Sequence, residues 1–187
     1  MKYEVRFSGS GGQGVITASV ILGAAAALYD GKHVIQSQSY GPEARGGATK
    51  ADVIIADGKI FYPKARTIDY LVSLTQKAAD KFISSVKKGG VVIVDSDFVE
   101  VPPSPAYVLY RLPMTSNALT TFNRLTTLNV VSLGAFVEVS RIVDAEAVRK
   151  AVMTYSPRGF EEMNLSSFEL GRELVRKTQR SEPHMAS

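Results

Sequence analysis

A glycine-rich segment near the N-terminus is the first candidate for chemistry in this sequence. Residues 9–14, Gly-Ser-Gly-Gly-Gln-Gly, match the pattern G-x-G-x-x-G between an expected strand and an expected helix. Such glycines let the backbone approach a phosphate group, which rests on the positive end of the helix. The residues expected to bind an anion in this way are Gly9, Gly11, Gly12, Gln13 and Gly14.

A dinucleotide cofactor is one interpretation of this turn, and it makes a second demand on the sequence. An acidic residue should stand at the carboxyl end of the second strand, where it would bind the ribose. That place holds Gln36, Ser37 and Gln38, and Asp30 lies at the wrong end of the strand. A Walker-type phosphate loop is excluded, since no Gly-Lys-Ser or Gly-Lys-Thr follows the turn. The dinucleotide interpretation therefore meets one of its two requirements.

A second candidate is the polar segment of residues 39–47, which is rich in glycine and contains Pro42. Arg45 can hold a carboxylate or a phosphate with its guanidinium group, and Glu43 can orient Arg45 or pair with a partner chain. The alternative is that these two side chains only pair with each other at the surface. In a doubly wound sheet the first two strands are neighbours, so this segment should lie beside the glycine-rich turn. We therefore expect a shared rim that also includes Ser39, Tyr40, Gly46 and Gly47.

Few other residues can carry chemistry. The sequence has no cysteine, which excludes disulfides, thiolate nucleophiles, and iron–sulfur or zinc sites built on cysteine. The two histidines, His33 and His184, are expected to be structural or solvated. The run Asp95-Ser96-Asp97 follows a buried strand and is expected to form a turn and cap a helix, because two carboxylates make a poor metal site. We predict no catalytic residue and no metal site in this chain alone.

The elements that must position these residues form an α/β pattern. Strands are expected at residues 3–7, 33–37, 51–56, 59–62, 70–74, 91–94 and 107–112. Helices are expected at residues 15–29, 75–88, 129–140 and 161–177, with another that Asp144 caps. The pair Asp57-Gly58 predicts a two-residue hairpin turn. The predicted fold is Rossmann-like, a mostly parallel sheet flanked by helices, with an antiparallel hairpin near residues 51–62.

Length and composition indicate one globular domain. We expect residues 1–180 to form a single α/β domain and residues 181–187 a disordered tail, whose last four residues are typical of a cloning remnant. The net charge of +4 comes from scattered basic residues, which predicts no nucleic-acid surface. A membrane helix needs about 20 apolar residues in a row, which the sequence lacks, and the N-terminus has the pattern of a strand rather than a signal peptide. We therefore expect a cytoplasmic protein without membrane contact.

Three motifs in this order resemble those of a known family. They are residues 9–15, residues 38–47 and the run Ala51-Asp52-Val53-Ile54-Ile55. Together they resemble the gamma subunit of the 2-oxoacid:ferredoxin oxidoreductases, within the pyruvate–ketoisovalerate oxidoreductase catalytic domain family. Shorter matches at residues 60–63, 69–72, 129–135 and 164–165 extend the resemblance over residues 3–177. The form Ser39-Tyr40-Gly41-Pro42-Glu43 is most similar to the 2-oxoglutarate or general 2-oxoacid enzymes, and Thr49-Lys50 stands where we expect Ser-Arg.

This resemblance implies a role within a larger enzyme. Such complexes oxidatively decarboxylate a 2-oxoacid, form an acyl-coenzyme A and pass the electrons to ferredoxin. Thiamine diphosphate and Mg2+ belong to the alpha and beta subunits, and the iron–sulfur clusters to the beta, delta or equivalent subunits. The gamma subunit is implied to pack near the active site and to help enclose it or receive coenzyme A. The chain would then bind no cofactor itself and be inactive alone.

We expect the glycine-rich turn and Arg45 to border the channel to the thiamine, where they would hold the pyrophosphate of coenzyme A or the distal carboxylate of the substrate. Two alternatives remain open: a stand-alone NAD(P)- or flavin-binding Rossmann oxidoreductase, and a scaffold that docks subunits without touching the reaction. The apolar helix of residues 130–139 is expected to be partly uncovered in the isolated chain, which would then form a homodimer.

Overall fold

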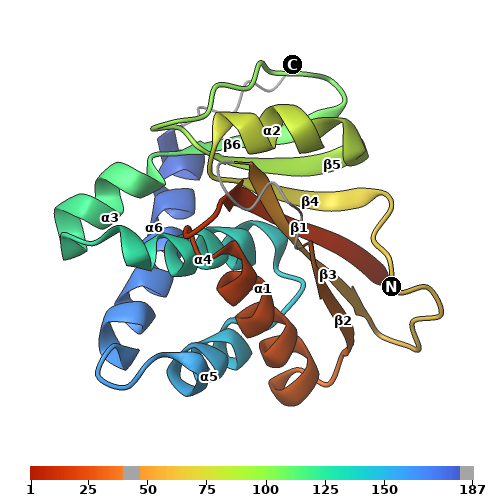
Figure 1. Ribbon diagram of the computed structural model, residues 1–187, viewed down its shortest axis with the longest axis horizontal. Coiled ribbons are helices and arrows are strands. Elements are labelled where there is room, and N and C mark those ends of the chain that lie inside the picture. The colour runs from red at the N-terminus through yellow and green to blue at the C-terminus, as the bar shows by residue number, and fades with distance from the viewer. Residues whose placement is uncertain (40–46, 182–187) are drawn as a thin grey trace.

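A six-stranded sheet forms the centre of the molecule in the computed structural model, which describes residues 1–39 and 47–181 (Figure 1). The strands are β1 (Lys2–Ser10), β2 (His33–Gln38), β3 (Ala48–Ala56), β4 (Ile68–Ser73), β5 (Val86–Asp95) and β6 (Tyr107–Leu112). They lie side by side in the order β2-β3-β1-β4-β5-β6. β3 is antiparallel to both of its neighbours, and β1, β4, β5 and β6 are parallel to one another. The predicted Rossmann-like, mostly parallel sheet is confirmed.

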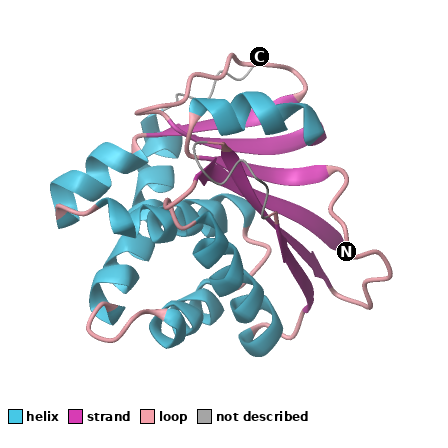
Figure 2. Cartoon of the chain, in the orientation of Figure 1, coloured by secondary structure: helices cyan, strands magenta, loops and turns pink. Residues whose placement is uncertain are grey.

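Helices cover both faces of this sheet, as Figure 2 shows. They are α1 (Val15–Ala24), α2 (Gln76–Phe82), α3 (Met114–Phe122), α4 (Leu128–Ser140), α5 (Ala145–Tyr155) and α6 (Glu161–Ser181), with a π-helical turn η1 (Ala25–Tyr29) and 3-10 turns η3 (Ile83–Ser85) and η4 (Leu125–Thr127). One face packs against α1 and α3 to α6 and forms the larger core, which includes Ile93. The other face packs against α2, where Val92 joins Ala79 and Phe82. Neighbouring residues of one strand thus serve opposite cores. No helix in the described part of the chain is long and apolar enough to cross a membrane.

Helix α4 is buried along most of its length, and α6 covers it. Residues 128–137 are all buried. A Cβ atom added to Gly134 would lie 2.0 Å from the backbone oxygen of Phe168, and one added to Gly171 would lie 1.9 Å from that of Val131. Glycine at both positions is what lets the two helix backbones approach so closely. The expectation that the apolar face of this helix is uncovered is therefore wrong, and the face offers no surface for the expected homodimer.

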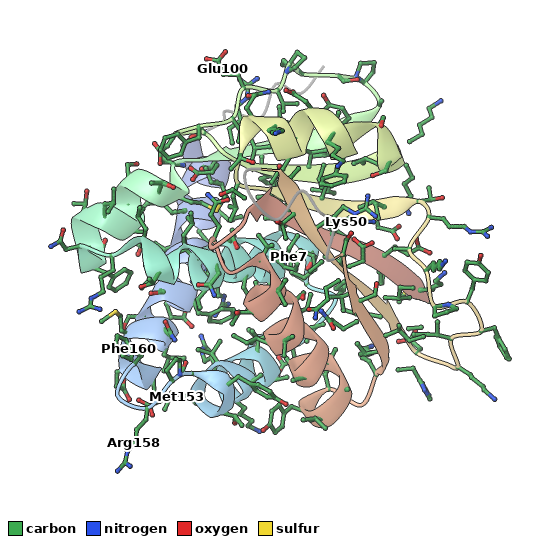
Figure 3. All side chains as sticks on the ribbon, in the orientation of Figure 1. Phe7, Lys50, Glu100, Met153, Arg158 and Phe160 are labelled. Atoms are coloured by element: carbon green, nitrogen blue, oxygen red, sulfur yellow. The ribbon has the colours of Figure 1, made fainter. Side chains whose placement is uncertain are left out.

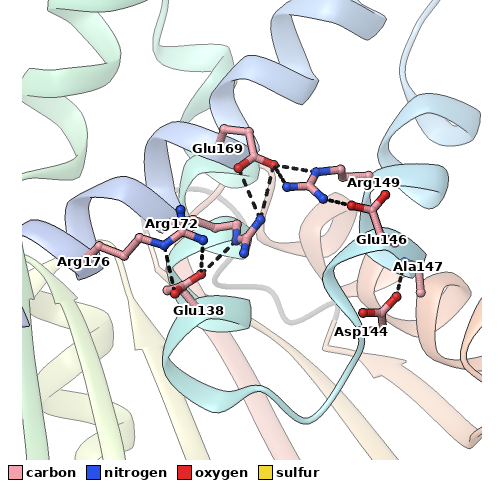
Figure 4. A network of polar contacts seen from close by, with 8 residues as sticks. All are labelled: Glu138, Asp144, Glu146, Ala147, Arg149, Glu169, Arg172 and Arg176. Carbon is pink, nitrogen blue, oxygen red and sulfur yellow. Dashed lines mark hydrogen bonds and ion pairs between the residues drawn. The ribbon is translucent and has the colours of Figure 1, made fainter.

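An ion-pair network holds α6 against α4 and α5 (Figure 4). Glu138 of α4 accepts hydrogen bonds from Arg172 Nε at 2.9 Å and from Arg176 Nε at 3.0 Å, both on α6. Glu169 of α6 accepts one from Arg149 Nε of α5 at 2.7 Å. The hydrogen bond from Arg176, aided by Arg172, holds the pKa of Glu138 below its ordinary value although burial opposes this. The network fixes the helical layer behind the sheet.

The antiparallel pairing differs in its partners from the expected hairpin. β3 pairs with β1 and β2, and residues 59–62 form a loop instead of a strand. Residues 51–56 are already paired with β1 on one edge and with β2 on the other, so residues 59–62 cannot pair with them. The Asp57 carboxylate is bound by the Met1 amino group at 2.7 Å and by Lys32 Nζ at 2.9 Å. β3 also lies between β1 and β2, so the expectation that the first two strands are neighbours is wrong. Their carboxyl ends still point to the same edge, because both strands are antiparallel to β3.

The helix expected at residues 75–88 ends earlier than the sequence suggested. α2 ends at Phe82, and Lys87, Lys88 and Gly89 lie in β5. Gly89 has a φ of +78° where the pairing of β5 with β4 shifts register, and Lys87 forms an ion pair with Asp69 of β4. Two lysines followed by glycine are typical of a helix end. Here the glycine serves a strand irregularity, and one lysine pairs across the sheet.

Candidate functional site

A cavity of about 570 Å³ lies at the carboxyl ends of β1 and β2, and we call it the carboxyl-edge cavity. Its wall combines the glycine-rich turn, the first turn of α1, the residue after β2, the start of β3 and the end of α2. The polar and glycine positions that matter most in this wall are Gly12, Gly14, Thr17, Ser39, Lys50 and Lys81. Open α/β sheets bind ligands outside the carboxyl ends of their strands, so the position alone makes this cavity the candidate site.

Hydrogen bonds within the glycine-rich turn stabilise its conformation. The Ser10 backbone N–H donates to Gln13 Oε1 at 2.7 Å, and the Gln13 N–H donates to the Ser10 carbonyl at 3.3 Å. A Cβ on Gly9 would lie 2.4 Å from Gln13 Oε1, while Gly12 and Gly14 have φ angles of +88° and +72°. A side chain at Gly9 would displace the Gln13 amide, and Gly12 and Gly14 are favoured by their left-handed backbone. Gln13 closes the turn, and its expected contact with an anion stays a prediction.

Helix α1 begins at the cavity without a side-chain cap. Gly14 occupies the N-cap position, its residue type offers no capping oxygen, and the first turn holds no acidic residue. Val15, Ile16 and Thr17, the first three helical residues, all line the cavity. Backbone N–H groups in a first helical turn have no partner within the helix, and the helix dipole is positive there. These donors suit a phosphate or a carboxylate.

Two lysines that sequence reasoning did not assign to a site also line the cavity, Lys50 of β3 and Lys81 of α2. Lys50, labelled in Figure 3, has its Nζ 3.1 Å from Asp52 Oδ2. The buried Asp52 carboxylate is also bound by Arg6 Nε at 2.7 Å. The cavity wall thus carries two basic side chains, of which Lys50 is paired with Asp52. Lys50 and Asp52 share a face because they are two residues apart in a strand, whereas the place of Lys81 depends on how α2 crosses the sheet.

Asn129 of α4 supports the turn from behind. A Cβ on Gly14 would lie 2.8 Å from Asn129 Nδ2, and the Asn129 side chain belongs to a residue that is only 8% exposed. Its Oδ1 has no hydrogen-bond partner within the described part of the chain. Sequence reasoning missed this contact, and the only local signal for it is a buried amide in a largely apolar helix.

The Asp95-Ser96-Asp97 run caps helix α3, as predicted. Asp95 accepts the Met114 N–H at 3.1 Å, and Asp97 accepts the Ser116 N–H at 2.7 Å. Burial raises the pKa of Asp95, against the hydrogen bonds that it accepts from Thr115 and from the Asp97 N–H. Among the described residues, no group of three or more His, Cys, Asp or Glu side chains could hold a metal ion.

The structure describes only the ends of the second candidate segment. Ser39 and Ala48 line the same cavity as the glycine-rich turn, and Ser10 pairs with Ala48 across β1 and β3. Gly47, the residue before β3, is buried. The remaining residues expected at this rim lie outside the described residues, so their place there stays a prediction: Tyr40, Glu43, Arg45 and Gly46.

The end of β2 shows what replaces the ribose-binding acid of a dinucleotide site. Gln36 Nε2 donates to Ser19 Oγ of α1 at 3.0 Å, which ties the strand to the helix. β2 lies at the edge of the sheet, and His33 is exposed at its start, which agrees with the expectation that this histidine is structural or solvated. An edge strand that ends in glutamine and serine side chains offers no carboxylate to a ribose.

The chain is similar in sequence and in structure to known proteins. Residues 4–174 match the family model described as pyruvate ferredoxin/flavodoxin oxidoreductase. The chain is 46% identical over 179 residues to the 2-oxoglutarate synthase subunit KorC of Methanocaldococcus jannaschii, which covers 95% of this chain and 96% of that protein. It is similar to the crystal structure of the gamma subunit of a keto/oxoacid ferredoxin oxidoreductase from Geobacter sulfurreducens, with a TM-score of 0.84, 45% identity, and coverage of 94% and 99% of the two chains.

A third relative shares the fold within a longer chain. It is the 2-oxoglutarate:ferredoxin oxidoreductase from Magnetococcus marinus, determined with 2-oxoglutarate, coenzyme A and succinyl-CoA bound. The TM-score is 0.83 at 20% identity, and the match covers all of this chain but only 33% of that one. The same fold is therefore covalently joined to further polypeptide in that enzyme.

Proposed function

Since the chain belongs to the pyruvate ferredoxin/flavodoxin oxidoreductase family, as the gamma subunit of a 2-oxoacid:ferredoxin oxidoreductase, we propose that its carboxyl-edge cavity binds an anionic group of coenzyme A or of the 2-oxoacid. In this proposal the cavity faces the reaction site of the partner subunits. The 2-oxoacid is 2-oxoglutarate, and the product is succinyl-CoA.

The observation that carries the proposal is the donor-rich end of α1 in a cavity whose wall also holds two lysines. Gly14 leaves the helix without a side-chain cap, and Lys50 and Lys81 stand in the same wall. An anion at a helix N-terminus gains about 0.3–1 kcal/mol at a surface and up to about 2 kcal/mol where it is partly buried. A pyrophosphate or a carboxylate is the kind of group that this arrangement stabilises.

The chemistry of this chain fits a division of labour with partner subunits. The sequence has no cysteine to ligate an iron–sulfur cluster, and the described residues hold no set of metal ligands. When bound in partner subunits, thiamine diphosphate would supply the reactive carbon for decarboxylation, and the clusters would accept the electrons. The part of this chain is to bind and orient an anion and to close the site against water.

The choice of 2-oxoglutarate has three supports. The KorC relative at 46% identity is described as a 2-oxoglutarate synthase subunit. The Ser-Tyr-Gly-Pro-Glu form of residues 39–43 is most similar to the same class. A substrate with two carboxylates also suits a cavity that carries two lysines and an uncapped helix end.

Replacing Arg45 tests the proposal. The complex is reconstituted from its subunits with wild-type or Arg45→Ala chain, and KM is measured for coenzyme A and for 2-oxoglutarate. A hydrogen bond to a charged group is worth about 1.5–3 kcal/mol, so one of the two KM values should rise about tenfold or more. Arg158→Ala, an exposed arginine far from Lys50 in Figure 3, is the matched control and should leave both values unchanged.

Three results would count against the proposal. Wild-type KM values for both substrates in the Arg45→Ala complex would remove Arg45 from the site. Full turnover by a complex that lacks this chain would show that it is a scaffold, and tight binding of NAD(H) or NADP(H) by the isolated chain would favour a nucleotide enzyme.

A further inference from the structure

The loop between β3 and β4 exposes aromatic side chains, and we call residues 57–67 the aromatic loop. It leaves the sheet beside the N-terminus and projects outward there in Figure 1. Phe61 is 86% exposed, the highest fraction among the large hydrophobic side chains that the structure describes, and Tyr62 is 45% exposed. A single exposed apolar side chain is ordinary on a protein surface, so its setting decides whether it has a role.

The aromatic loop is held at both ends. Asp57 is bound by the Met1 amino group at 2.7 Å, and the Arg66 and Thr67 N–H groups donate to Glu4 Oε2 at 2.6 and 3.0 Å. Burial would raise the pKa of Glu4, but the hydrogen bonds from Lys2 and from these two N–H groups hold it below its ordinary value. Glu4 is therefore charged at neutral pH and accepts the hydrogen bonds that hold this end of the loop. Because both ends of the loop are held, less backbone entropy is lost when it binds.

All the charged side chains near the tip of the aromatic loop are positive. Lys59, Lys64 and Arg66 are basic, and residues 58–68 contain no aspartate or glutamate. Lys59 Nζ lies 5.7 Å from the ring centroid of Phe61, and the Arg66 guanidinium lies 4.2 Å from that of Tyr62. The ion pairs of the described residues include none of these three cations. The tip thus combines an aromatic anchor with a rim of positive charge.

The aromatic loop and the carboxyl-edge cavity lie at opposite ends of β1. Lys2 pairs with Ala56 next to the loop, and Ser10 pairs with Ala48 next to the cavity. Nine residues of strand separate the two ends by roughly 26 Å at about 3.3 Å per residue. A change at the loop tip therefore leaves the cavity intact, and the two sites can be tested apart.

We propose that the aromatic loop docks Phe61 into an apolar pocket rimmed by carboxylates on a partner subunit of the oxidoreductase. This inference rests on the proposed function in that it takes the chain to work inside the complex. A tip-to-tip contact between two copies of this chain does not suit the loop, because it would bring two basic tips together. A partner subunit does suit it, since the Magnetococcus enzyme shows this fold attached to further polypeptide.

The test measures binding of the full-length chain to its immobilised partner subunits. Phe61→Ser should raise the dissociation constant about thirtyfold, as for the loss of an aromatic anchor in an interface. Phe61→Leu keeps an apolar side chain and should bind close to wild type. Leu28→Ser removes an apolar side chain that is 64% exposed at η1 and should leave the affinity unchanged. Equal thermal unfolding midpoints of the four chains show that each is folded.

Charge is tested in the same format. Lys59→Gln with Lys64→Gln should slow association and reduce its dependence on salt, because carboxylates on the partner steer the encounter. Wild-type affinity of Phe61→Ser overturns the inference, and so does concentration-dependent self-association that Phe61→Ser abolishes, since that result assigns the loop to a second copy. A wild-type chain that binds no partner subunit overturns the proposed function as well. An assembled complex with unchanged KM in Arg45→Ala removes only Arg45 from the proposed anion site.

Discussion

Alanine at Gly14 tests how the candidate site is built, because two separate costs meet at this position. Its φ of +72° is unfavourable for a residue with a Cβ, and the new atom would stand 2.8 Å from Asn129 Nδ2, where ordinary contact begins at 3.4 Å. Gly12 has a φ of +88° with nothing within 4 Å of its Cβ position. Gly12→Ala therefore measures the backbone cost alone, and Gly14→Ala measures both costs.

The magnitudes follow from these distances. Left-handed backbone costs a non-glycine residue about 1–2 kcal/mol, which is the expected loss of unfolding free energy in Gly12→Ala. Insertion of a methyl group against a buried helix costs about 1–3 kcal/mol more, so Gly14→Ala should lose about 3 kcal/mol. Asn129→Ala in the Gly14→Ala background removes the Nδ2 contact and the Cγ contact at 2.9 Å but leaves Cβ at 3.0 Å. That double variant should recover about 1 kcal/mol.

The assay is urea unfolding of the four chains, with the free energies compared at equal slope. Gly14→Ala should also raise KM in the reconstituted complex more than Gly12→Ala, because the added methyl pushes the start of α1 away from α4. Equal losses for Gly12→Ala and Gly14→Ala, or no recovery in the double variant, would refute the reasoning that Asn129 supports the turn.

Two further predictions concern carboxylates with lowered pKa values. Glu138→Gln should lower the unfolding free energy by about 2–3 kcal/mol at pH 7, because Arg172 and Arg176 lose their partner. Since folding lowers the pKa of Glu138, the difference between wild type and variant is at its maximum above about pH 5 and is lost as the pH falls through the folded pKa. Equal differences in urea unfolding at pH 7 and pH 3 would contradict this prediction. Hydrogen bonds from the Met1 amino group and, second, from Lys32 lower the pKa of Asp57 to about 2. An NMR titration of the Asp57 carboxyl carbon should therefore have its midpoint there, and the midpoint should rise in Lys32→Met. A midpoint near 4 in the wild type would show that these contacts at the base of the aromatic loop are absent.

The fold was predictable where local pattern and backbone chemistry decide it. The Gly9–Gly14 turn and its position before α1 follow from residue type and spacing. The capping role of Asp95 and Asp97 was expected from residue type, but their partner helix α3 lies further along the chain and is set by tertiary packing. The expected hairpin failed because β1 and β2, which are distant in sequence, occupy both edges of residues 51–56. The strand order failed for the same reason: β3 inserts between β1 and β2, and only tertiary pairing determines that.

The candidate site likewise has features that the sequence predicts and features that depend on tertiary packing. The need for glycine at positions 12 and 14 was visible in the motif, because left-handed backbone favours glycine. The contributions of Lys50, Lys81 and Asn129 were not visible, because each comes from a separate element that the sheet and its helices bring together. The burial of α4 likewise depends on its close crossing with α6, which the sequence of neither helix predicts alone.

Blocking the carboxyl-edge cavity tests the central claim most directly. The chain has no cysteine of its own, so Thr17→Cys gives a single thiol in the exposed part of the cavity wall, and Lys150→Cys gives a control thiol on α5. Each chain is alkylated with a bulky maleimide before reconstitution. We predict that the blocked Thr17→Cys complex assembles normally and shows KM for coenzyme A or 2-oxoglutarate raised about tenfold or more, while the labelled Lys150→Cys complex matches wild type. Wild-type KM values for both substrates in the blocked Thr17→Cys complex would contradict the claim.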